Sequence, residues 1–362
     1  MKINYTMYGT GLTGGVRVLL EIANGLVERG HDVTLTTLGS KEDHAWFPLK
    51  AEVIYQNIPQ FVKAFRYGSA KYLKGDWFNS SPTLELRKLA NATPGDVDIN
   101  VATYCFTAYS VFSSGSGIPF YHMQHYEPLF FDDVFMSKLA ETTYYLPINK
   151  IANSIWLKNL MRDKFRIDLP VVNPAIDHEL FFPRDFERDT ENLRVVAFGK
   201  QTRWKGFPEL LEAMKIVMGK VKNIEFIVYG GNRPNYPSSV PYTFLQSPSD
   251  EQLATLYSSA DVVVTSSWYE SFPLPPIEAM ACGAPVVTTQ YGTEDYAFAE
   301  QNALVVPPKD PSSLANAIER LLIDEHLREQ FKREGPKIAK TFTWDKTIDQ
   351  VETVFKDSLK VD

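Results

Sequence analysis

The sequence predicts an α/β protein built from two doubly wound, Rossmann-like halves. Strand and helix patterns alternate along the chain, and glycines follow the first strand of each half. The 362 residues are also enough for two domains, at roughly 100–200 residues each. Prolines interrupt the periodicity near 168–190. We therefore expect one domain at 1–170 plus 343–362 and a second at 171–342.

The first half opens on a strand, a glycine loop and a helix. Residues 3–8 read as a strand, and the glycine-rich loop Gly9–Gly15 follows. Apolar residues recur at helical spacing through 16–27, and Gly30 stands where helices commonly end. Residues 33–38 form the next strand. This unit predicts a parallel sheet with a right-handed crossover.

The second half repeats the alternation. Its expected strands are 193–199, 224–229, 261–265 and 284–288, and its expected helices are 207–218, 314–323 and 325–340. The strands at 261–265 and 284–288 are short and mainly apolar, which is typical of strands covered on both faces.

Composition excludes several classes of protein. Apolar residues make up 44% and charged residues 22%, so a disordered or fibrous chain is excluded. The net charge of −7 argues against nucleic-acid binding, which needs a basic face. Two distant cysteines, Cys105 and Cys282, fit a reducing compartment better than a disulfide framework. No apolar run is long enough to span a membrane, and the N-terminus lacks a signal-peptide pattern. We expect a cytoplasmic protein.

The loop Gly9-x-Gly11-x-x-Gly14 fits the dinucleotide-binding fingerprint. That fingerprint also needs an acidic residue at the end of the second strand, where Leu38-Gly39-Ser40 stands here. A turn that packs helix on strand explains these glycines as well as phosphate contact does. A nicotinamide-dependent oxidoreductase built on this loop is one alternative function.

The most informative stretch is 266–287. A buried strand runs into a loop that carries Glu270, and Pro276 suits the first position of a helix. We expect Glu278 in the first turn of that helix and Gly283 at its end. Both carboxylates would then flank the carboxyl end of a parallel strand, where open α/β sheets bind ligands. A solvated loop charge at Glu270 and a dipole-complementing glutamate at Glu278 are the simpler explanations.

These residues resemble a known family. The Glu270-x7-Glu278 motif and its surroundings are similar to the donor-binding segment of retaining GT-B glycosyltransferases, family 4 (glycosyl transferases group 1). Residues 198–206 resemble the family's Gly-Arg-x4-Lys-Gly segment, and 227–231 resemble its next glycine-ended strand. Residues 121–128 resemble the Gln-[Asp/His]-Tyr-Glu-Pro segment of members that act on bacterial or archaeal surface glycans.

The resemblance implies a GT-B fold, with two domains facing each other across a cleft. The N-terminal domain would take the acceptor and the C-terminal domain the donor, and a last helix at 343–359 would cross back to the first domain. The implied enzyme is a hexosyltransferase that uses a nucleoside-diphosphate sugar, with retention and without a metal or other cofactor. Its acceptor would be a glycan or a lipid-linked sugar, as in cell-surface polysaccharide or glycoconjugate synthesis.

The resemblance also implies roles for individual residues. Lys205, with Lys200 or Arg203, would neutralise the departing pyrophosphate. Glu270 would lie near the sugar, and His125 would approach it from the first domain. The implied catalytic residues are His125, Glu270 and Lys205. The implied donor-binding residues are Gly14, Gly15, Lys200, Arg203, Lys205, Gly230, Phe272, Pro273, Leu274 and Glu278, the last of these on the ribose hydroxyls.

Three positions depart from the family pattern. Lys200 replaces an arginine and loses its bidentate fork, and Ser271 and Pro273 replace glycines. Pro273 also lacks an N–H that could bind a sugar hydroxyl. The identity of the sugar therefore stays open, and a catalytically inactive nucleotide- or carbohydrate-binding protein of the same fold is a second alternative.

Other motifs have simpler explanations. Asp96-Val97-Asp98 has the form of a metal motif but reads better as the entry to a strand. His122 and His125 lack a third ligand for zinc. The segment 61–78 mixes aromatic and basic residues, which would suit a membrane surface or a lipid-linked acceptor. A helix with one core face and one solvated face explains it more simply.

Overall fold

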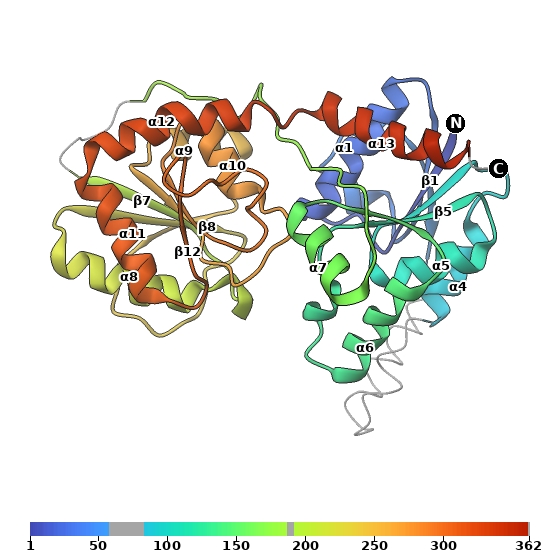
Figure 1. Ribbon diagram of the computed structural model, residues 1–362, viewed down its shortest axis with the longest axis horizontal. Coiled ribbons are helices and arrows are strands. Elements are labelled where there is room, and N and C mark those ends of the chain that lie inside the picture. The colour runs from blue at the N-terminus through green and yellow to red at the C-terminus, as the bar shows by residue number, and fades with distance from the viewer. Residues whose placement is uncertain (58–82, 187–191, 361–362) are drawn as a thin grey trace. The chain divides into compact units, whose positions relative to one another are not determined.

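The computed structural model describes residues 1–57, 83–186 and 192–360 (Figure 1). The segment 61–78 lies outside them. The chain divides into two compact units. The N-terminal unit comprises Met1–Asn153, Leu157–Asn173 and Trp344–Asp362, and the C-terminal unit comprises Ser154–Trp156 and Pro174–Thr343. In the part of the chain that is described, no helix is both long and apolar enough to cross a bilayer.

The N-terminal unit contains one six-stranded sheet in the order β3-β2-β1-β4-β5-β6. All of its strand pairs are parallel. This is the Rossmann order, which reverses direction between β1 and β4. The strands are β1 (Lys2–Met7), β2 (Asp32–Leu38), β3 (Glu52–Gln56), β4 (Ile99–Ala102), β5 (Ile118–Met123) and β6 (Asn149–Ala152).

The helices of the N-terminal unit cover its sheet. The α-helices are α1 (Gly14–Glu28), α4 (Thr83–Ala92), α5 (Cys105–Ser114), α6 (Val134–Thr142), α7 (Ile155–Phe165) and α13 (Trp344–Ser358). The 3-10 helices in its described residues are η1 (Lys41–His44), η2 (Glu127–Phe130) and η3 (Thr143–Tyr145). Thr13 caps α1, because its hydroxyl accepts a hydrogen bond from Val16 N.

A polar ladder runs through the middle of this sheet. Asn4 Nδ2 donates to Asn100 Oδ1 at 2.9 Å, and Thr36 Oγ1 donates to Asn4 Oδ1 at 2.8 Å. All three side chains are fully buried and lie on the three adjacent strands β4, β1 and β2. Because buried polar groups are costly unless satisfied, this ladder favours one register of the central strands.

The last helix, α13, packs on α1 although it is the last element of the chain (Figure 1). A Cβ added at Gly25 would lie 2.7 Å from two side-chain carbons of Ile348, so only glycine allows this approach. Phe355 packs against Phe120 with ring centroids 5.0 Å apart, and His31 Nε2 lies 2.8 Å from Glu352 Oε1. The N-terminal unit is thus completed by the C-terminus of the chain.

The C-terminal unit contains a second sheet in the order β12-β11-β10-β7-β8-β9, with all of its pairs parallel. Counted from β7, this is again the Rossmann order. The strands are β7 (Leu193–Phe198), β8 (Ile224–Gly230), β9 (Thr243–Gln246), β10 (Val262–Val264), β11 (Val286–Thr289) and β12 (Leu304–Val306). The helices are η4 (Arg203–Lys205), α8 (Phe207–Lys220), α9 (Asp250–Ser258), α10 (Leu274–Ala281), α11 (Pro311–Ile323) and α12 (Glu325–Ala339).

Both faces of the second sheet are buried. Along β7, Val195 and Ala197 belong to a core cluster that includes α8 and α11. Val196, between them, belongs to a second cluster that includes α9 and α10. This alternation follows from the two-residue period of a strand. The helices α8 and α10 therefore cover opposite faces of the sheet.

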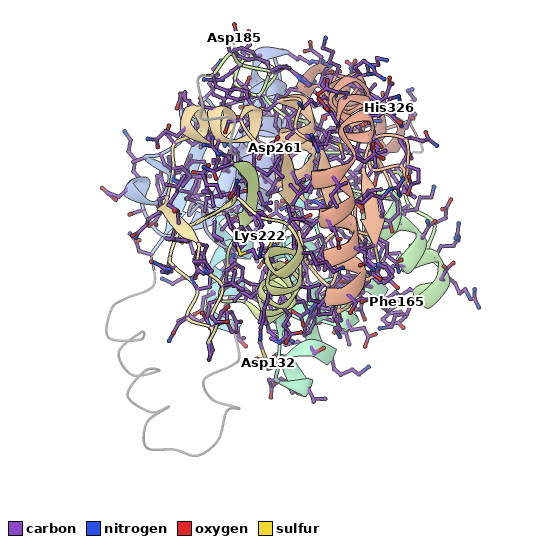
Figure 2. The ribbon with its side chains drawn as sticks, turned by 90° about the vertical axis from the view of Figure 1, so that its left-hand side faces the viewer. Asp132, Phe165, Asp185, Lys222, Asp261 and His326 are labelled. Atoms are coloured by element: carbon purple, nitrogen blue, oxygen red, sulfur yellow. The ribbon has the colours of Figure 1, made fainter. Side chains whose placement is uncertain are left out.

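Polar contacts join the strands at the amino edge of this sheet. Asp261, labelled in Figure 2, precedes β10, and its carboxylate accepts from Arg194 N at 2.7 Å. The Arg194 guanidinium donates to Glu225 on β8 at 2.7 Å. These charged groups at the amino edge hold neighbouring strands together.

One expected boundary is wrong. The sequence places Pro276 at the first helical position and Glu278 in the first turn, but α10 begins at Leu274, with Pro273 as its N-cap. Two prolines fit in the first turn because amides there have no partner within the helix. Glu278 is therefore the fifth residue of α10, past the turn where the helix dipole acts most strongly.

Candidate active site

The carboxyl ends of β7 and β10 form the switch point of the second sheet. These strands are adjacent, and β7 leads to α8 on one face while β10 leads to α10 on the other. The connections 199–206 and 265–273 therefore start at the edge of the sheet where open α/β sheets bind ligands. Half of the site residues expected from the sequence lie on these two connections.

Lys205 and Glu270 meet at this point. The Lys205 ammonium is ion-paired with Oε1 of Glu270, and the side chains are 20% and 13% exposed. Ser267 Oγ donates to the same carboxylate oxygen at 2.7 Å. A largely buried pair with an extra hydrogen bond holds its geometry better than an exposed one. The structure thus brings together two of the three expected catalytic residues.

Backbone contacts hold the two connections together. Trp268 N donates to Trp204 O at 2.7 Å, and Ser266 Oγ donates to Lys205 O at 3.1 Å. Gly206 has φ 67°, and a Cβ added there would lie 1.9 Å from Ser266 O. No other residue fits at that contact. The Lys205 side chain is therefore presented from a fixed backbone.

Glu270 is held from a third connection as well. Gly292, after β11, has φ 89°, and a Cβ added there would lie 2.3 Å from Glu270 O. Glu270 N donates to Tyr291 O at 3.3 Å. In addition, Thr289 Oγ1 donates to Ser267 O at 2.5 Å. The end of β11 thus supports both Glu270 and the serine that binds it.

Lys200 adds a second positive charge near the pair. Burial and the neighbouring ammonium of Lys205 lower the pKa of Lys200, while the Glu270 carboxylate acts in the opposite direction. Two neighbouring ammonium groups repel each other, and a bound anion relieves that repulsion. The site therefore suits a ligand with more than one negative charge.

Arg203 is engaged elsewhere. Its guanidinium donates two hydrogen bonds to Glu209 of α8, at 2.8 and 2.7 Å. The same guanidinium lies 4.2 Å from the centre of the Trp268 ring. Lys309 Nζ lies 4.0 Å from the centre of the same ring. Burial opposes the ionisation of Glu209, but the hydrogen bonds and charge of Arg203, together with hydrogen bonds from the Glu209 backbone and Trp268, lower the pKa of Glu209. In this structure Arg203 fastens η4 to α8.

Glu278 is a buried carboxylate on α10. Burial, and after it the charge of Glu278, raises the pKa of Tyr229 at the end of β8. Tyr229 and Tyr257 share a hydrogen bond of 2.5 Å between their hydroxyls. Glu278 therefore lies near the carboxyl end of β8, the strand adjacent to β7.

The other expected donor-binding residues of this unit have structural contacts. The Phe272 side chain is 8% exposed and packs on Tyr296 and Phe342, so only its backbone is available to a ligand. Pro273 O accepts from the Tyr296 hydroxyl at 2.7 Å, and Leu274 begins α10. A Cβ added at Gly230 would lie 2.4 Å from Gly199 O, so this glycine lets the ends of β7 and β8 approach. The donor-binding roles of these four residues therefore stay predictions.

Gly14, Gly15 and His125 belong to the N-terminal unit. Gly14 begins α1, and a Cβ added at Gly15 would lie 3.0 Å from Oε1 of Gln124. His125 is buried, its Nδ1 donates to Tyr126 O at 3.2 Å, and its ring lies 4.8 Å from that of Phe130. The amino end of α1 and the segment after β5 thus lie side by side. Their roles toward the donor stay predictions.

The alternative motifs are accounted for by structure. Asp98 accepts from Lys2 N at 2.7 Å and Asp96 is ion-paired with the Lys2 side chain, which confirms the reading of 96–98 as the entry to a strand. Burial lowers the pKa of His122 to about 4. Among the residues that the structure describes, no group of three or more histidine, cysteine, aspartate or glutamate side chains is arranged to hold a metal ion.

Residues 180–338 match the family profile described as glycosyl transferases group 1. This range contains Lys205, Glu270 and Glu278. The C-terminal unit therefore belongs to the glycosyl transferases group 1 family. Among curated proteins, a D-inositol 3-phosphate glycosyltransferase of Corynebacterium glutamicum is 30% identical over 219 residues, which cover 53% of this chain and 52% of the relative. The chain spans about half the length of the curated relatives it matches.

Two further likenesses concern an archaeal relative and the fold. An uncharacterized glycosyltransferase of Methanocaldococcus jannaschii is 28% identical over 221 residues, 56% of each chain. Sucrose-phosphate synthase from Thermosynechococcus elongatus matches all of both chains with a TM-score of 0.75 and 18% identity. Anabaena HepE in complex with UDP-glucose matches 99% of this chain and 100% of its own, with a TM-score of 0.73 and 17% identity. Such likeness shows the fold, which is GT-B with two Rossmann-like units.

Sequence reasoning missed several residues of the site. Ser267 donates a hydrogen bond to Glu270, and Glu209 accepts one from Arg203. Gly292 lies against the backbone of the loop that carries Glu270. Ser267 could have been found as a hydroxyl three positions before Glu270 in the same loop. Nothing in the spacing indicates that Gly292 contacts that loop, because the contact depends on how β11 pairs with β10.

Proposed function

We propose that this protein is a retaining glycosyltransferase that moves a sugar from a nucleoside-diphosphate sugar to a glycan or lipid-linked acceptor. The observation that carries the proposal is the pairing of Lys205 with Glu270 at the switch point of the second sheet, within the matched glycosyltransferase segment. Lys200 adds positive charge beside the pair. Cations next to a carboxylate, at the carboxyl ends of parallel strands, suit a ligand that has both a pyrophosphate and a sugar.

The proposed reaction exchanges one bond at the anomeric carbon of the sugar. The bond from that carbon to the phosphate oxygen breaks, and its electron pair stays on the nucleoside diphosphate. The acceptor hydroxyl oxygen bonds to the same carbon and releases its proton. Lys205 and Lys200 stabilise the charge that develops on the pyrophosphate, because preorganised cations act most strongly where charge appears. Glu270 binds a sugar hydroxyl or stabilises the positive character of the ring.

The remaining predicted roles belong to other residues of the two units. Glu278 binds the ribose hydroxyls, since a carboxylate accepts two hydrogen bonds. The backbone at Phe272, Pro273 and Leu274 borders the sugar, and the carbonyl of Pro273 is already bonded to Tyr296. His125, with the amino end of α1 at Gly14 and Gly15, acts from the N-terminal unit. A cytoplasmic location, with contact at the inner membrane face and a role in cell-surface glycan synthesis, completes the proposal.

A thermal-shift panel of nucleotides and nucleotide sugars tests the proposal, because a ligand of the folded state raises Tm. UDP and UDP-glucose come first in the panel, since HepE was solved with UDP-glucose. We expect one nucleoside diphosphate to raise the Tm of the wild type and not that of Lys205→Met. Transfer is then assayed with the matching sugar donor. Binding without transfer to any acceptor would favour the inactive binding protein, and no binding at all would overturn both.

A further inference from the structure

One buried carboxylate fastens the segment 124–130, which follows β5, to the amino end of α5. Glu127 is 2% exposed, and its side chain accepts a hydrogen bond from Cys105 N. Cys105 is the first residue of α5, so its N–H has no acceptor within the helix. The bond therefore satisfies a helix amide and ties the connections after β4 and β5 to each other.

Neutral groups surround this carboxylate. The titratable groups that face it are Tyr104 and Cys105 at the start of α5, Tyr121 on β5 and Tyr144 in η3. Burial raises the pKa of every one of them. No cation of the described chain is among the groups that affect Glu127, and burial raises the pKa of its carboxyl to about 7.

Such an environment is costly for a carboxyl group. Burying one without a cationic partner disfavours folding when the group is ionised, and an apolar side chain would avoid that cost. We therefore look for a specific contact of the Glu127 carboxyl that offsets this cost. The contact in the structure is the bond to Cys105 N, supported by Glu127 N donating to the Tyr144 hydroxyl at 3.2 Å.

His125 lies two residues before this anchor. Its ring donates from Nδ1 to Tyr126 O and packs against Phe130, so both contacts are made within the segment that Glu127 holds. Donation from Nδ1 to a carbonyl also fixes the tautomer of the neutral ring. The orientation of His125 therefore depends on where this segment lies.

We propose that Glu127 is a positioning residue for His125, which it holds in place by binding the first amide of α5. This inference rests on the role proposed above for His125. Glu127 does not touch the substrate. It acts only by fixing the segment that carries the histidine.

Three single variants test the hydrogen bond between Cys105 N and the Glu127 side chain, two at its acceptor and one at its donor. Glu127→Ala removes the acceptor, and Glu127→Gln keeps an oxygen that can accept from Cys105 N. Cys105→Pro removes the backbone donor, and with it the thiol that also hydrogen-bonds the carboxylate, while Glu127 itself stays in place. Proline is tolerated at the first position of a helix, and Tyr104, at φ −152° and ψ 151°, already has the extended conformation that precedes a proline. Circular dichroism and Tm establish that each variant folds.

The kinetic readout is a double-mutant cycle with His125→Ala. We expect Glu127→Ala and Cys105→Pro to lower kcat at least about tenfold, as misplacement of a group at the reacting centre does. The same changes should add little in a His125→Ala background, because they act through that residue. Glu127→Gln should stay within about threefold of wild type. The Kd for the nucleoside diphosphate should not change in any variant.

Hydrogen exchange of the segment 124–130 gives a readout that does not require transfer activity. Both Glu127→Ala and Cys105→Pro should raise exchange there above wild type, with Glu127→Gln near wild type. Unchanged protection, or full kcat in both variants, overturns the inference. If His125→Ala itself transfers sugar normally, the role proposed for His125 fails instead. The two failures are therefore distinguishable.

Discussion

Lys205 and Glu270 are 65 positions apart in the sequence and form an ion pair at the carboxyl edge of the second sheet. In this arrangement the cation expected to bind phosphate and the carboxylate expected to bind sugar neutralise each other. Under the proposed function, a nucleoside diphosphate would compete with Glu270 for Lys205. The donor sugar would relieve that competition, because its hydroxyls offer Glu270 other partners.

The first prediction concerns this competition. Glu270→Gln should bind the free nucleoside diphosphate about three- to tenfold more tightly than wild type, because it releases the Lys205 ammonium. Its transfer rate should nevertheless fall about 100-fold or more, as happens when an electrostatic contact to a transition state is removed. Calorimetry gives the affinity and a transfer assay gives kcat. Lys205→Met should lose both nucleotide affinity and transfer activity. Weaker nucleotide binding by Glu270→Gln would contradict the proposed competition for Lys205.

The second prediction concerns Glu278. Replacing it with glutamine should weaken nucleoside-diphosphate binding about 10- to 100-fold, the size of effect expected for hydrogen bonds to a charged group. Glu319→Gln is the matched control, because Glu319 forms an exposed ion pair with Lys220 on the surface of the same unit. Calorimetry should show equal affinity for that control and the wild type. Equal loss in both variants would mean that the effect is not specific to the site.

The third prediction separates Arg203 from Lys205. The bidentate pair with Glu209 already satisfies the Arg203 guanidinium. We therefore expect Arg203→Gln to reduce nucleotide affinity less than Lys205→Met does, and to lower Tm by a few degrees. Glu209→Gln should lower Tm in the same way. A loss of affinity in Arg203→Gln as large as that in Lys205→Met would place the Arg203 guanidinium on the donor.

The fourth prediction concerns pH and Glu127. Its pKa is raised from 4.5 to about 7 in the folded protein, so the folded state binds the proton more tightly than the unfolded state. The stability that this carboxyl contributes is complete below the unfolded pKa and is lost as pH rises toward 7. The loss is on the order of 3 kcal/mol.

Glu127→Gln cannot titrate at this position. The free energy of unfolding of Glu127→Gln, relative to wild type, should therefore increase between pH 4.5 and 8, by up to about 3 kcal/mol. Urea titrations of both proteins at a series of pH values measure the difference, and all other groups cancel. A difference that stays constant across this range would show that Glu127 titrates normally.

The fifth prediction compares two glycines of the same unit. Gly206→Ala should destabilise the protein strongly, because its Cβ would overlap Ser266 O and its φ is positive. Gly219→Ala, in the exposed last turn of α8, should stabilise it by about 0.5–1 kcal/mol, since no atom lies within 4 Å of the added carbon. Thermal unfolding distinguishes the two. Equal and small effects would mean that the loop can move away from Ser266.

The sequence predicts the fold through local rules. Hydrophobic spacing places β7, α8 and β8 within a few residues of their observed bounds, and the two-residue strand period accounts for cores on both faces. The start of α10 was misplaced because proline is equally acceptable at the first two or three helical positions. Lys205 and Glu270 were expected at one site because the segments that carry them both resemble the donor-binding part of one glycosyltransferase family.

Contacts between connections could not be predicted in this way. The hydrogen bond from Ser267 to Glu270 depends on side-chain rotamers in a single loop. The pairing of Arg203 with Glu209 depends on the turn through Gly206, where φ is positive. The contact of Gly292 with Glu270 needs the register of β11 against β10. Each is set by tertiary geometry, which the hydrophobic pattern of the chain does not carry.

The position of α13 has a consequence for biosynthesis. This helix supplies Ile348 and Phe355 to the N-terminal unit, yet it is translated after the whole C-terminal unit. While the ribosome makes the C-terminal unit, the face of α1 that contains Gly25 remains uncovered. The N-terminal unit therefore cannot finish folding until α13 has been made, and a chaperone that shields α1 during synthesis would act on this protein until that helix emerges.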